Sequence, residues 1–348
     1  MLRYIARRLL ALPVVLLLVT LVLFVLMWQL PLEQRAMLYM PSIKAHPTEA
    51  ELARLTEQII ERHGLDRPAP VQYLAWLRNL ARGQWGYSPT WRQNVLEGLL
   101  RRAPATLELA LAAMIPAIAL ALWLGPLAAR YRHRLPDQAI RLAASVAWAF
   151  PAFILGLLLM NLFYARLGWF PPERWSLWAG QVVRAEPFRW YTGLYGLDAL
   201  LNGRLDLAVD ALRHLVLPAA TLAVAQWALL TRVLRAAMLE ALSQDYVSTA
   251  RAKGLPERQI VRRHAQRNAL LPLISTGGVA VSLLITGTVL VELVFSYPGV
   301  GRGAVQAILA TDVPVAVGFA LFAGLVTILA SLLADVLYAV ADPRLRLY

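Results

Sequence analysis

The sequence predicts an all-α polytopic membrane protein with six transmembrane helices. Hydrophobic residues make up 59% of the 348-residue chain, which is more than a soluble globular domain usually carries. Six runs without Asp, Glu, Lys or Arg reach, or nearly reach, the roughly 20 residues that cross a bilayer. Basic residues gather at the ends of these runs, as they do at the ends of membrane helices.

The six runs are distributed over the whole chain. The fourth is the shortest, at 18 residues, and can lengthen only by taking in Arg213 or Arg232. Several runs contain or adjoin a proline, which membrane helices tolerate when neighbouring groups satisfy the freed carbonyls. The predicted spans are residues 9–30, 109–129, 142–165, 214–231, 269–291 and 313–334.

The first run must be compared with a signal peptide, because Arg3, Arg7 and Arg8 precede it. The apolar core of a signal peptide has about 7–15 residues and ends at a small-residue cleavage site. The run 9–30 has 22 residues, and no such site follows it. We therefore expect residues 1–30 to form a retained first transmembrane helix.

The basic residues also predict which side of the membrane each loop faces. With six spans both termini share a side, so segments 1–8, 130–141, 232–268 and 342–348 form one set. That set carries 17 basic residues in 64 positions, whereas the three remaining loops carry 17 in 144 positions. Because Lys and Arg favour the cytoplasmic side, we expect both termini, including a tail at 342–348, to be cytoplasmic. The basic residues at the helix ends then account for the net charge of +13, and no nucleic-acid partner is expected.

The first outer loop, residues 31–103, is predicted to contain an amphipathic helix. Thr48 and Glu51 fit a capping box, and apolar residues then recur at helical spacing as far as Gly64. We expect this helix to lie over the outer face of the bundle. The second outer loop, 166–213, has four tryptophans, which favour anchoring at the membrane interface over ligand binding.

The polar, basic stretch 240–272 lies between two apolar runs and predicts two short helices joined by a hinge. Residues 240–252 lack Pro and Gly and are rich in helix formers. Lys253 and Gly254 suit a cation in the last turn and a left-handed C-terminal cap. Pro256 is expected as the first residue of the second helix, with Glu257 in its first turn. Such a unit at a membrane surface is compact enough for another protein to bind.

This stretch resembles the cytoplasmic coupling loop of ABC-importer permeases, in the form found in the dipeptide/oligopeptide/nickel branch. The branch pattern is E-x4-DY-V-x-TARAKG, followed nine residues later by H-x-x-RNA-x-x-P, and here Gln266 replaces a more usual apolar residue. The resemblance implies that loop 239–268 couples the chain to an ATPase. The residues that it assigns to coupling are Glu240, Asp245, Tyr246, Thr249, Ala250, Arg251, Ala252, Lys253 and Gly254.

Shorter stretches extend the resemblance over nearly the whole chain. Residues 65–73 and 83–88 resemble the branch's L-D-x-P-x-x-x-Q-Y and G-D-L-G-x-S elements, although Gln84 and Trp85 replace the usual pair. The stretch 83–88 is equally compatible with an ordinary external turn. Residues 295–302 and 311–314 resemble F-x-x-P-G-x-G and R-D-Y-P, with Thr311 and Val313 in place of Arg and Tyr.

The resemblance implies a type I ABC-importer permease fold, with residues 104–341 as a core of five transmembrane helices. It implies a second related permease, two ATP-binding-cassette ATPases that bind ATP-Mg, and an extracytoplasmic solute-binding protein as partners. Membrane lipid is a further expected partner of the chain. The implied location is the plasma (inner) membrane of a bacterium or archaeon. Di- or oligopeptides are the implied cargo, and nickel chelates or another small solute are the alternative.

The sequence contains no pattern typical of an ATP-binding, metal-binding or catalytic site. The phosphate-binding pattern G-x4-G-K-[ST] is absent, so no ATP site is predicted. The five histidines are scattered without ligand spacing, and neither H-E-x-x-H nor G-x-S-x-G occurs. We therefore expect a non-catalytic subunit without catalytic, cofactor-binding or metal-binding residues.

An ion-coupled secondary carrier is the alternative from a different class. Carriers usually hold ionisable residues near the membrane midplane, whereas the central turns of all six predicted helices lack Asp, Glu, Lys and Arg. We therefore expect energy to come from a partner at the coupling loop, and a pathway lined by hydroxyl, amide and backbone groups. The polar residues expected near this pathway are Thr221, Gln226, Ser275, Ser282, Thr286 and Thr288.

Overall fold

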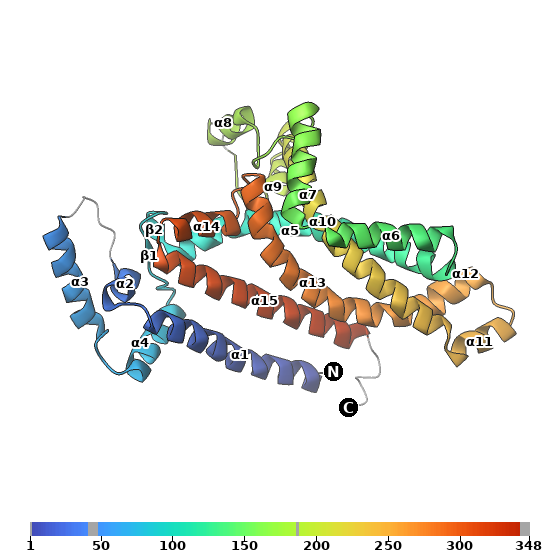
Figure 1. The fold of residues 1–348 in the computed structure, drawn as a ribbon, viewed down its shortest axis with the longest axis horizontal. Helices are drawn as coiled ribbons and strands as arrows, with labels where there is room; N and C mark the ends of the chain where they lie inside the picture. The colour runs from blue at the N-terminus through green and yellow to red at the C-terminus, as the bar shows by residue number, and fades with distance from the viewer. Residues whose placement is uncertain (1, 41–47, 186–187, 342–348) are drawn as a thin grey trace. The chain divides into compact units, whose positions relative to one another are not determined.

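The computed structural model describes residues 2–40, 48–185 and 188–341, so the predicted tail 342–348 lies outside the described residues. The described chain is helical almost throughout, and its one sheet pairs the two-residue strands β1 (Tyr87–Ser88) and β2 (Gln93–Asn94) antiparallel. The predicted all-α class is confirmed. In chain order the helices are α1 (Leu2–Trp28), α2 (Leu32–Ala36), η1 (Met37–Tyr39), α3 (Glu49–His63), α4 (Ala69–Ala81), α5 (Val95–Arg130), α6 (Leu135–Ala149), α7 (Ala152–Leu159), η2 (Met160–Arg166), α8 (Leu177–Ala185), α9 (Tyr195–Leu201), α10 (Leu205–Leu242), α11 (Asp245–Ala252), α12 (Glu257–Gln259), η3 (Ile260–Ala265), α13 (Gln266–Val294), α14 (Val300–Leu309) and α15 (Val313–Ala341) (Figure 1).

Within the described residues, five helices are long and apolar enough to cross a membrane, and a bent pair makes a sixth span if it is counted as one. The five are Leu10–Trp28 in α1, the whole of α5, α10 and α15, and the helix Glu257–Val294 that α12, η3 and α13 form together. The bent pair is α6 with α7 and η2. Each of the six predicted spans therefore has a counterpart.

The third predicted span, 142–165, is wrong as a single straight helix. The helical segments Leu135–Ala149 and Ala152–Arg166 meet at 98°, as the directions of α6 and α7 show in Figure 1. Phe150 between them is extended, with φ −82° and ψ 123°. The ring of Pro151 causes this break, because it disfavours the helical conformation of the residue before it.

Helices α5 and α10 are longer than predicted, with 36 and 38 residues. At 1.5 Å per residue they reach about 54–57 Å, so both extend beyond a hydrocarbon core of about 30 Å. The fourth span has lengthened by taking in both Arg213 and Arg232. Arg213 donates hydrogen bonds to the carbonyl oxygens of Gly168 and Trp169. The guanidinium of Arg232 lies 4.6 Å from the ring centre of Trp148, an arrangement that favours a cation.

The chain divides into two compact units, of which unit 1 comprises residues 1–7, 105–298 and 329–348. In unit 1, α10 packs against α13, α6, α9 and α7. One apolar core contains Leu109 of α5, Leu222 of α10 and Leu284 of α13, and a second contains Leu234 and Ala269. Many alanines line both cores, and such small side chains allow membrane helices to approach closely.

Unit 2 comprises residues 8–104 and 299–328 and contains the predicted amphipathic helix as α3. The Thr48 hydroxyl accepts a hydrogen bond from the Glu51 amide, and the Glu51 carboxylate accepts one from the Thr48 amide, so the capping box is confirmed. Gly64 ends α3 at φ +60°, as its position predicts. Helix α4 follows and buries Trp76 against Phe24; this helix was not predicted.

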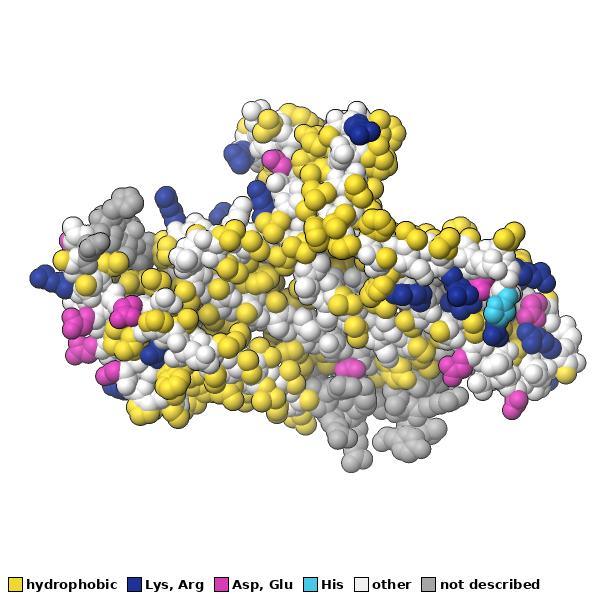
Figure 2. Space-filling view, in the orientation of Figure 1, with side chains coloured by type: hydrophobic (Ala, Val, Ile, Leu, Met, Phe, Trp, Pro, Cys, Tyr) yellow, Lys and Arg dark blue, Asp and Glu magenta, His cyan; other side chains and the backbone are white. Residues whose placement is uncertain are grey.

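Large apolar side chains are exposed along the spans. Leu142 of α6 and Leu333 of α15 are among them, and Figure 2 shows hydrophobic side chains over α6 and α7. A soluble protein rarely leaves such continuous apolar surface in water, whereas lipid solvates it. The surface therefore supports a multi-pass membrane protein.

Candidate functional site

The predicted coupling loop contains one short helix, a left-handed glycine and a second helical segment. Helix α11 ends with Lys253 as its C-cap, and Gly254 follows at φ +76°. The amide of Gly254 donates to the carbonyl of Arg251 at 2.9 Å, and the amide of Leu255 donates to the carbonyl of Ala250 at 3.3 Å. This pair of hydrogen bonds is the Schellman ending of a helix. The predicted left-handed cap is therefore confirmed.

Two predicted boundaries of this loop are wrong. The helix expected over 240–252 is interrupted, because α10 ends at Leu242 and Gln244 is extended at φ −78° and ψ 152°. The hydroxyl of Ser243 donates to the carbonyl of Glu240 at 2.8 Å, a local bond that competes with helical hydrogen bonding. Glu240 thus belongs to the last turn of α10. Pro256 is the N-cap of α12, one residue before its predicted place in the helix.

One face of α11 packs onto the end of unit 1. Val247 and Ala250 are buried with Ile260, and the side-chain amide of Asn268 donates to the Tyr246 hydroxyl at 2.9 Å. Ala250 therefore positions the helix from its buried side. The other predicted coupling residues of this segment are exposed: Asp245, Tyr246, Thr249, Arg251, Ala252, Lys253 and Gly254.

An ion pair spans the turn at Gly254. Nη2 of Arg251 lies 2.9 Å from Oε1 of Glu257, and Nε lies 3.3 Å from Oε2. The hydrogen bond to Glu257 raises the pKa of the Arg251 guanidinium. Because the two side chains are 49% and 45% exposed, water screens the pair and it contributes at most about 1 kcal/mol. Its effect is to fix the direction of the turn.

Three of the residues predicted to line a pathway are buried in unit 1. They are Thr221, Gln226 and Thr288. The hydroxyl of Thr221 donates to the carbonyl of Leu217 at 2.8 Å, and that of Thr288 to the carbonyl of Ile285 at 2.7 Å. These hydroxyls bond to their own helices, and their role in a pathway stays a prediction.

The other three predicted pathway residues lie on α13. Ser275 and Thr286 are exposed and Ser282 is half-buried. Their spacing of seven and four residues places them on one side of the helix, together with exposed Val279 and Leu290. This side of α13 is therefore a continuous accessible strip with hydroxyl groups and no charge.

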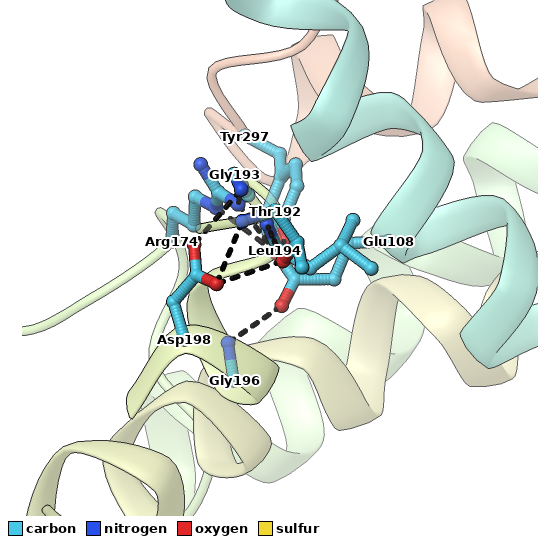
Figure 3. A network of polar contacts seen from close by, with 8 residues as sticks. All are labelled: Glu108, Arg174, Thr192, Gly193, Leu194, Gly196, Asp198 and Tyr297. Atoms are coloured by element: carbon cyan, nitrogen blue, oxygen red, sulfur yellow. Dashed lines mark hydrogen bonds and ion pairs between the residues drawn. The ribbon is translucent and has the colours of Figure 1, made fainter. Parts of the chain in front are cut away.

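A buried ion pair that the sequence does not mark joins α5 to the second outer loop. Nη2 and Nε of Arg174 lie 2.7 and 3.1 Å from Oε2 of Glu108, and both side chains are 9% exposed. The Tyr297 hydroxyl donates to the same oxygen at 3.2 Å, and the Gly196 amide donates to Oε1 at 2.8 Å (Figure 3). Arg174 also donates to the carbonyl of Gly193 at 2.7 Å. One carboxylate thus connects α5, the loop and the segment after α13.

The second outer loop is itself held by a buried carboxylate. Asp198 accepts hydrogen bonds from the amide and hydroxyl of Thr192 at 3.0 and 2.8 Å, and from the amide of Gly193 at 2.8 Å (Figure 3). The ring of Trp175 packs edge-on against the ring of buried Tyr195. The described residues of the loop therefore pack around a small core, to which Trp175 contributes.

One histidine of the described chain, His214, helps to hold the second outer loop in place. Nδ1 of buried His214 is 2.7 Å from the carbonyl oxygen of Pro172, and Asp210, one turn earlier, accepts from the Ser176 amide at 3.0 Å. Both side chains hold the outer loop onto α10. In the part of the chain that the structure describes, no group of three or more His, Asp or Glu side chains could hold a metal ion.

Two stretches that carry the resemblance meet in unit 2. The Ser88 hydroxyl donates to Oδ2 of Asp312 at 2.6 Å, and the Thr90 amide donates to the same oxygen at 3.2 Å. The other carboxylate oxygen accepts from the Val315 amide at 3.2 Å and so caps α15. Gly86 is required beside this contact, because its φ is +95° and an added Cβ would lie 2.9 Å from a backbone oxygen.

Family comparisons agree with this arrangement of apolar spans. Residues 117–347 match the family of binding-protein-dependent transport system inner membrane components, and residues 1–110 match the N-terminal part of such membrane components. The chain belongs to this family. Membership confirms the predicted type I importer permease fold and the predicted function as a transport permease, and it does not support the secondary-carrier alternative.

Several relatives of this permease are similar over most of their length. It is 40% identical over 289 residues to the di/tripeptide transport system permease protein DppB of Pseudomonas aeruginosa. The aligned region covers 83% of this chain and 84% of that protein. It is 41% identical over 292 residues to the probable D,D-dipeptide transport system permease protein DdpB of Escherichia coli, covering 84% of each. It is 35% identical over 344 residues to the oligopeptide transport system permease protein AppB of Bacillus subtilis, covering 99% of each.

Proposed function

We propose that this permease forms half of the translocation pathway of an ATP-driven importer of di- or oligopeptides. The observation that carries the proposal is the position of α11. This helix connects α10 to the span Glu257–Val294, and Val247 and Ala250 pack onto Ile260. A force applied to the exposed face of α11 therefore reaches two membrane helices through short, packed connections.

The energy comes from partners in this proposal. Two ATP-binding-cassette ATPases hold ATP-Mg, because this chain has no phosphate-binding loop. One of them contacts the exposed face of α11. A second related permease supplies the other half of the pathway, and an extracytoplasmic binding protein delivers the cargo. The termini and residues 240–268 face the cytoplasm of a bacterial or archaeal cell, as the basic residues indicate.

Peptide cargo is supported by the relatives' names and by the chemistry of α13. The strip with Ser275, Ser282 and Thr286 carries hydroxyl groups and no charge. Such a surface can accept hydrogen bonds from a peptide backbone without selecting among side chains. It therefore suits cargo whose main chain is its only constant feature.

The proposal is tested by assembly and uptake together. An affinity tag on this chain is expected to copurify a second permease and an ATPase in mild detergent. A strain without this chain should lose uptake of a radiolabelled dipeptide, and the intact gene should restore it. Purification as a lone chain, or restored uptake of a nickel chelate but not of any peptide, would reject the peptide-importer proposal.

A further inference from the structure

A groove of about 790 Å³ lies at the coupling-loop end of unit 1. Its walls come from the last turns of α10, from α11, from η3 and the start of α13, and from the end of α15. Glu240, Tyr246, Arg263, Arg267 and Ser275 are among the lining residues. Figure 2 shows acidic, basic and histidine side chains gathered over the end of this unit that carries α11 and α12.

The groove continues the accessible strip of α13. Ser275 belongs to both, since it lines the groove and is exposed. Arg267, Leu271 and Ser275 follow one another at four-residue intervals and all line the groove. Val279 is the next residue in this row and is exposed, so the row leads along one side of the helix. A solute that moves along the strip therefore reaches the groove at its coupling-loop end.

The charged side chains that line the groove take part in none of the ion pairs formed among the described residues. Arg263, Arg267 and Glu240 are exposed. Arg263 and Arg267 are four residues apart, which brings their side chains to the same side of the helix. The groove thus offers two guanidinium groups and one carboxylate to a single ligand.

We propose that this groove is the cytoplasmic exit site of the pathway and that it binds both charged termini of a peptide. Arg263 and Arg267 bind the terminal carboxylate, for which the guanidinium fork is suited, and Glu240 binds the terminal ammonium. The site recognises the zwitterion and no particular side chain. The inference rests on the proposed function, because it takes the strip of α13 to be the pathway. A lipid headgroup fits less well, since hydroxyl groups at Ser275, Ser282 and Thr286 interrupt the surface that acyl chains would cover.

Because the chain has no cysteine, a single Ser275→Cys substitution reports occupancy of the groove. The assembled complex in detergent, without binding protein, is treated with a maleimide in the presence of alanyl-alanine or its N-acetyl and C-amide derivatives. The free dipeptide should slow labelling of the Ser275→Cys chain. Each blocked derivative should need an about tenfold higher concentration for the same protection, as expected for one lost charge-assisted hydrogen bond. Gln138→Cys is the matched position, since Gln138 is exposed on α6 and does not line the groove.

A second comparison tests the arginines. Arg263→Gln in the Ser275→Cys chain should raise the protecting concentration of free dipeptide about tenfold, and Arg263→Lys should raise it less. Arg262→Gln is the control, because Arg262 is the exposed neighbour that does not line the groove. Assembly with the ATPase shows that each variant has folded.

The outcomes separate the inference from the function on which it rests. Equal protection by free and blocked dipeptides, or equal effects of Arg263→Gln and Arg262→Gln, overturns the exit site. Protection by added phosphatidylethanolamine and by no peptide assigns the groove to lipid and also overturns it. If the Ser275→Cys complex takes up dipeptide but no peptide protects it, only the exit site fails. If the unsubstituted complex takes up no peptide while it assembles and hydrolyses ATP, the peptide function itself fails.

Discussion

Arg174 donates two hydrogen bonds to one carboxylate oxygen of Glu108, at 2.7 and 3.1 Å, although the residues are 66 positions apart in the sequence. Tyr297 and the Gly196 amide complete the carboxylate's donors. Burial raises the pKa of Tyr297, with the charge of Glu108 as a further cause, so the phenol stays a donor at physiological pH. The pair fixes the second outer loop on α5.

Removing this carboxylate should destabilise unit 1 strongly. Glu108→Ala leaves the Arg174 guanidinium buried without a counter-charge, which costs about 3–5 kcal/mol. The free energy of unfolding of the purified permease measures the effect. Arg251→Ala is the control, because its pair with Glu257 is nearly half exposed and should cost at most about 1 kcal/mol. Equal losses in the two variants would contradict the assigned role of Glu108.

Unit 2 should respond in the same way to the loss of Asp312. Asp312→Ala removes the acceptor of Ser88, Thr90 and Val315, so we expect a loss of about 2–4 kcal/mol, since it combines a lost helix cap with buried donors left unpaired. Hydrogen exchange should accelerate in residues 87–94 and in the first turn of α15. Ser88→Ala should cost less, because the cap of α15 remains. Unchanged exchange in Asp312→Ala would show that the contact does not hold the turn.

Local signals in the sequence predicted the local features. The Thr48–Glu51 capping box, the glycines at 64 and 254 and the six apolar runs each depend on residues that are close together in the chain. The break in the helix at Ser243 was missed because a single serine among residues that favour helices does not predict where a helix ends. The 98° bend at Phe150 was missed because membrane helices often keep a proline without breaking.

The contacts between distant residues could not be predicted from one sequence. Ser88 and Asp312 are 224 positions apart, and Glu108 and Tyr297 are 189 apart. A serine or a glutamate looks the same in the sequence whether its partner is water or a buried side chain. The same limit applies to the pathway residues, since Thr221 and Ser275 differ only in which side of their helix is covered.

Substitutions at Gly254 should separate backbone strain from contact with a partner. An added Cβ meets nothing within 4 Å, but φ is +76°, so Gly254→Ala costs roughly 1 kcal/mol through the backbone alone. Gly254→Asn tolerates this conformation better. If α11 contacts the ATPase, Gly254→Asp and Gly254→Asn should leave the protein inserted and abolish the stimulation of ATP hydrolysis by loaded binding protein.

The substitutions at Gly254 can also contradict the proposed contact between α11 and the ATPase. Full stimulation in Gly254→Asp would exclude this surface from coupling. Loss in Gly254→Ala together with normal stimulation in Gly254→Asn would assign the effect to strain. Glu240→Lys should also uncouple the complex, because it reverses the charge at the junction of α10 with the loop.

Membrane orientation is tested with single cysteines at exposed positions. Ala53→Cys in α3 and Gln181→Cys in α8 should react in intact cells with a maleimide that cannot cross the membrane, and Gln138→Cys in α6 should react only after the cells are opened. All three positions are exposed. Labelling of Gln138→Cys in intact cells, with Ala53→Cys protected, would reverse the orientation.

We propose that this permease takes its energy from ATP through a partner and not from an ion gradient. Uptake of a radiolabelled dipeptide is measured while a protonophore collapses the proton gradient and cellular ATP is maintained. We expect uptake to continue and to require the binding protein. Uptake abolished by the protonophore at constant ATP, or transport by the reconstituted chain alone under an ion gradient, would show that an ion gradient drives transport.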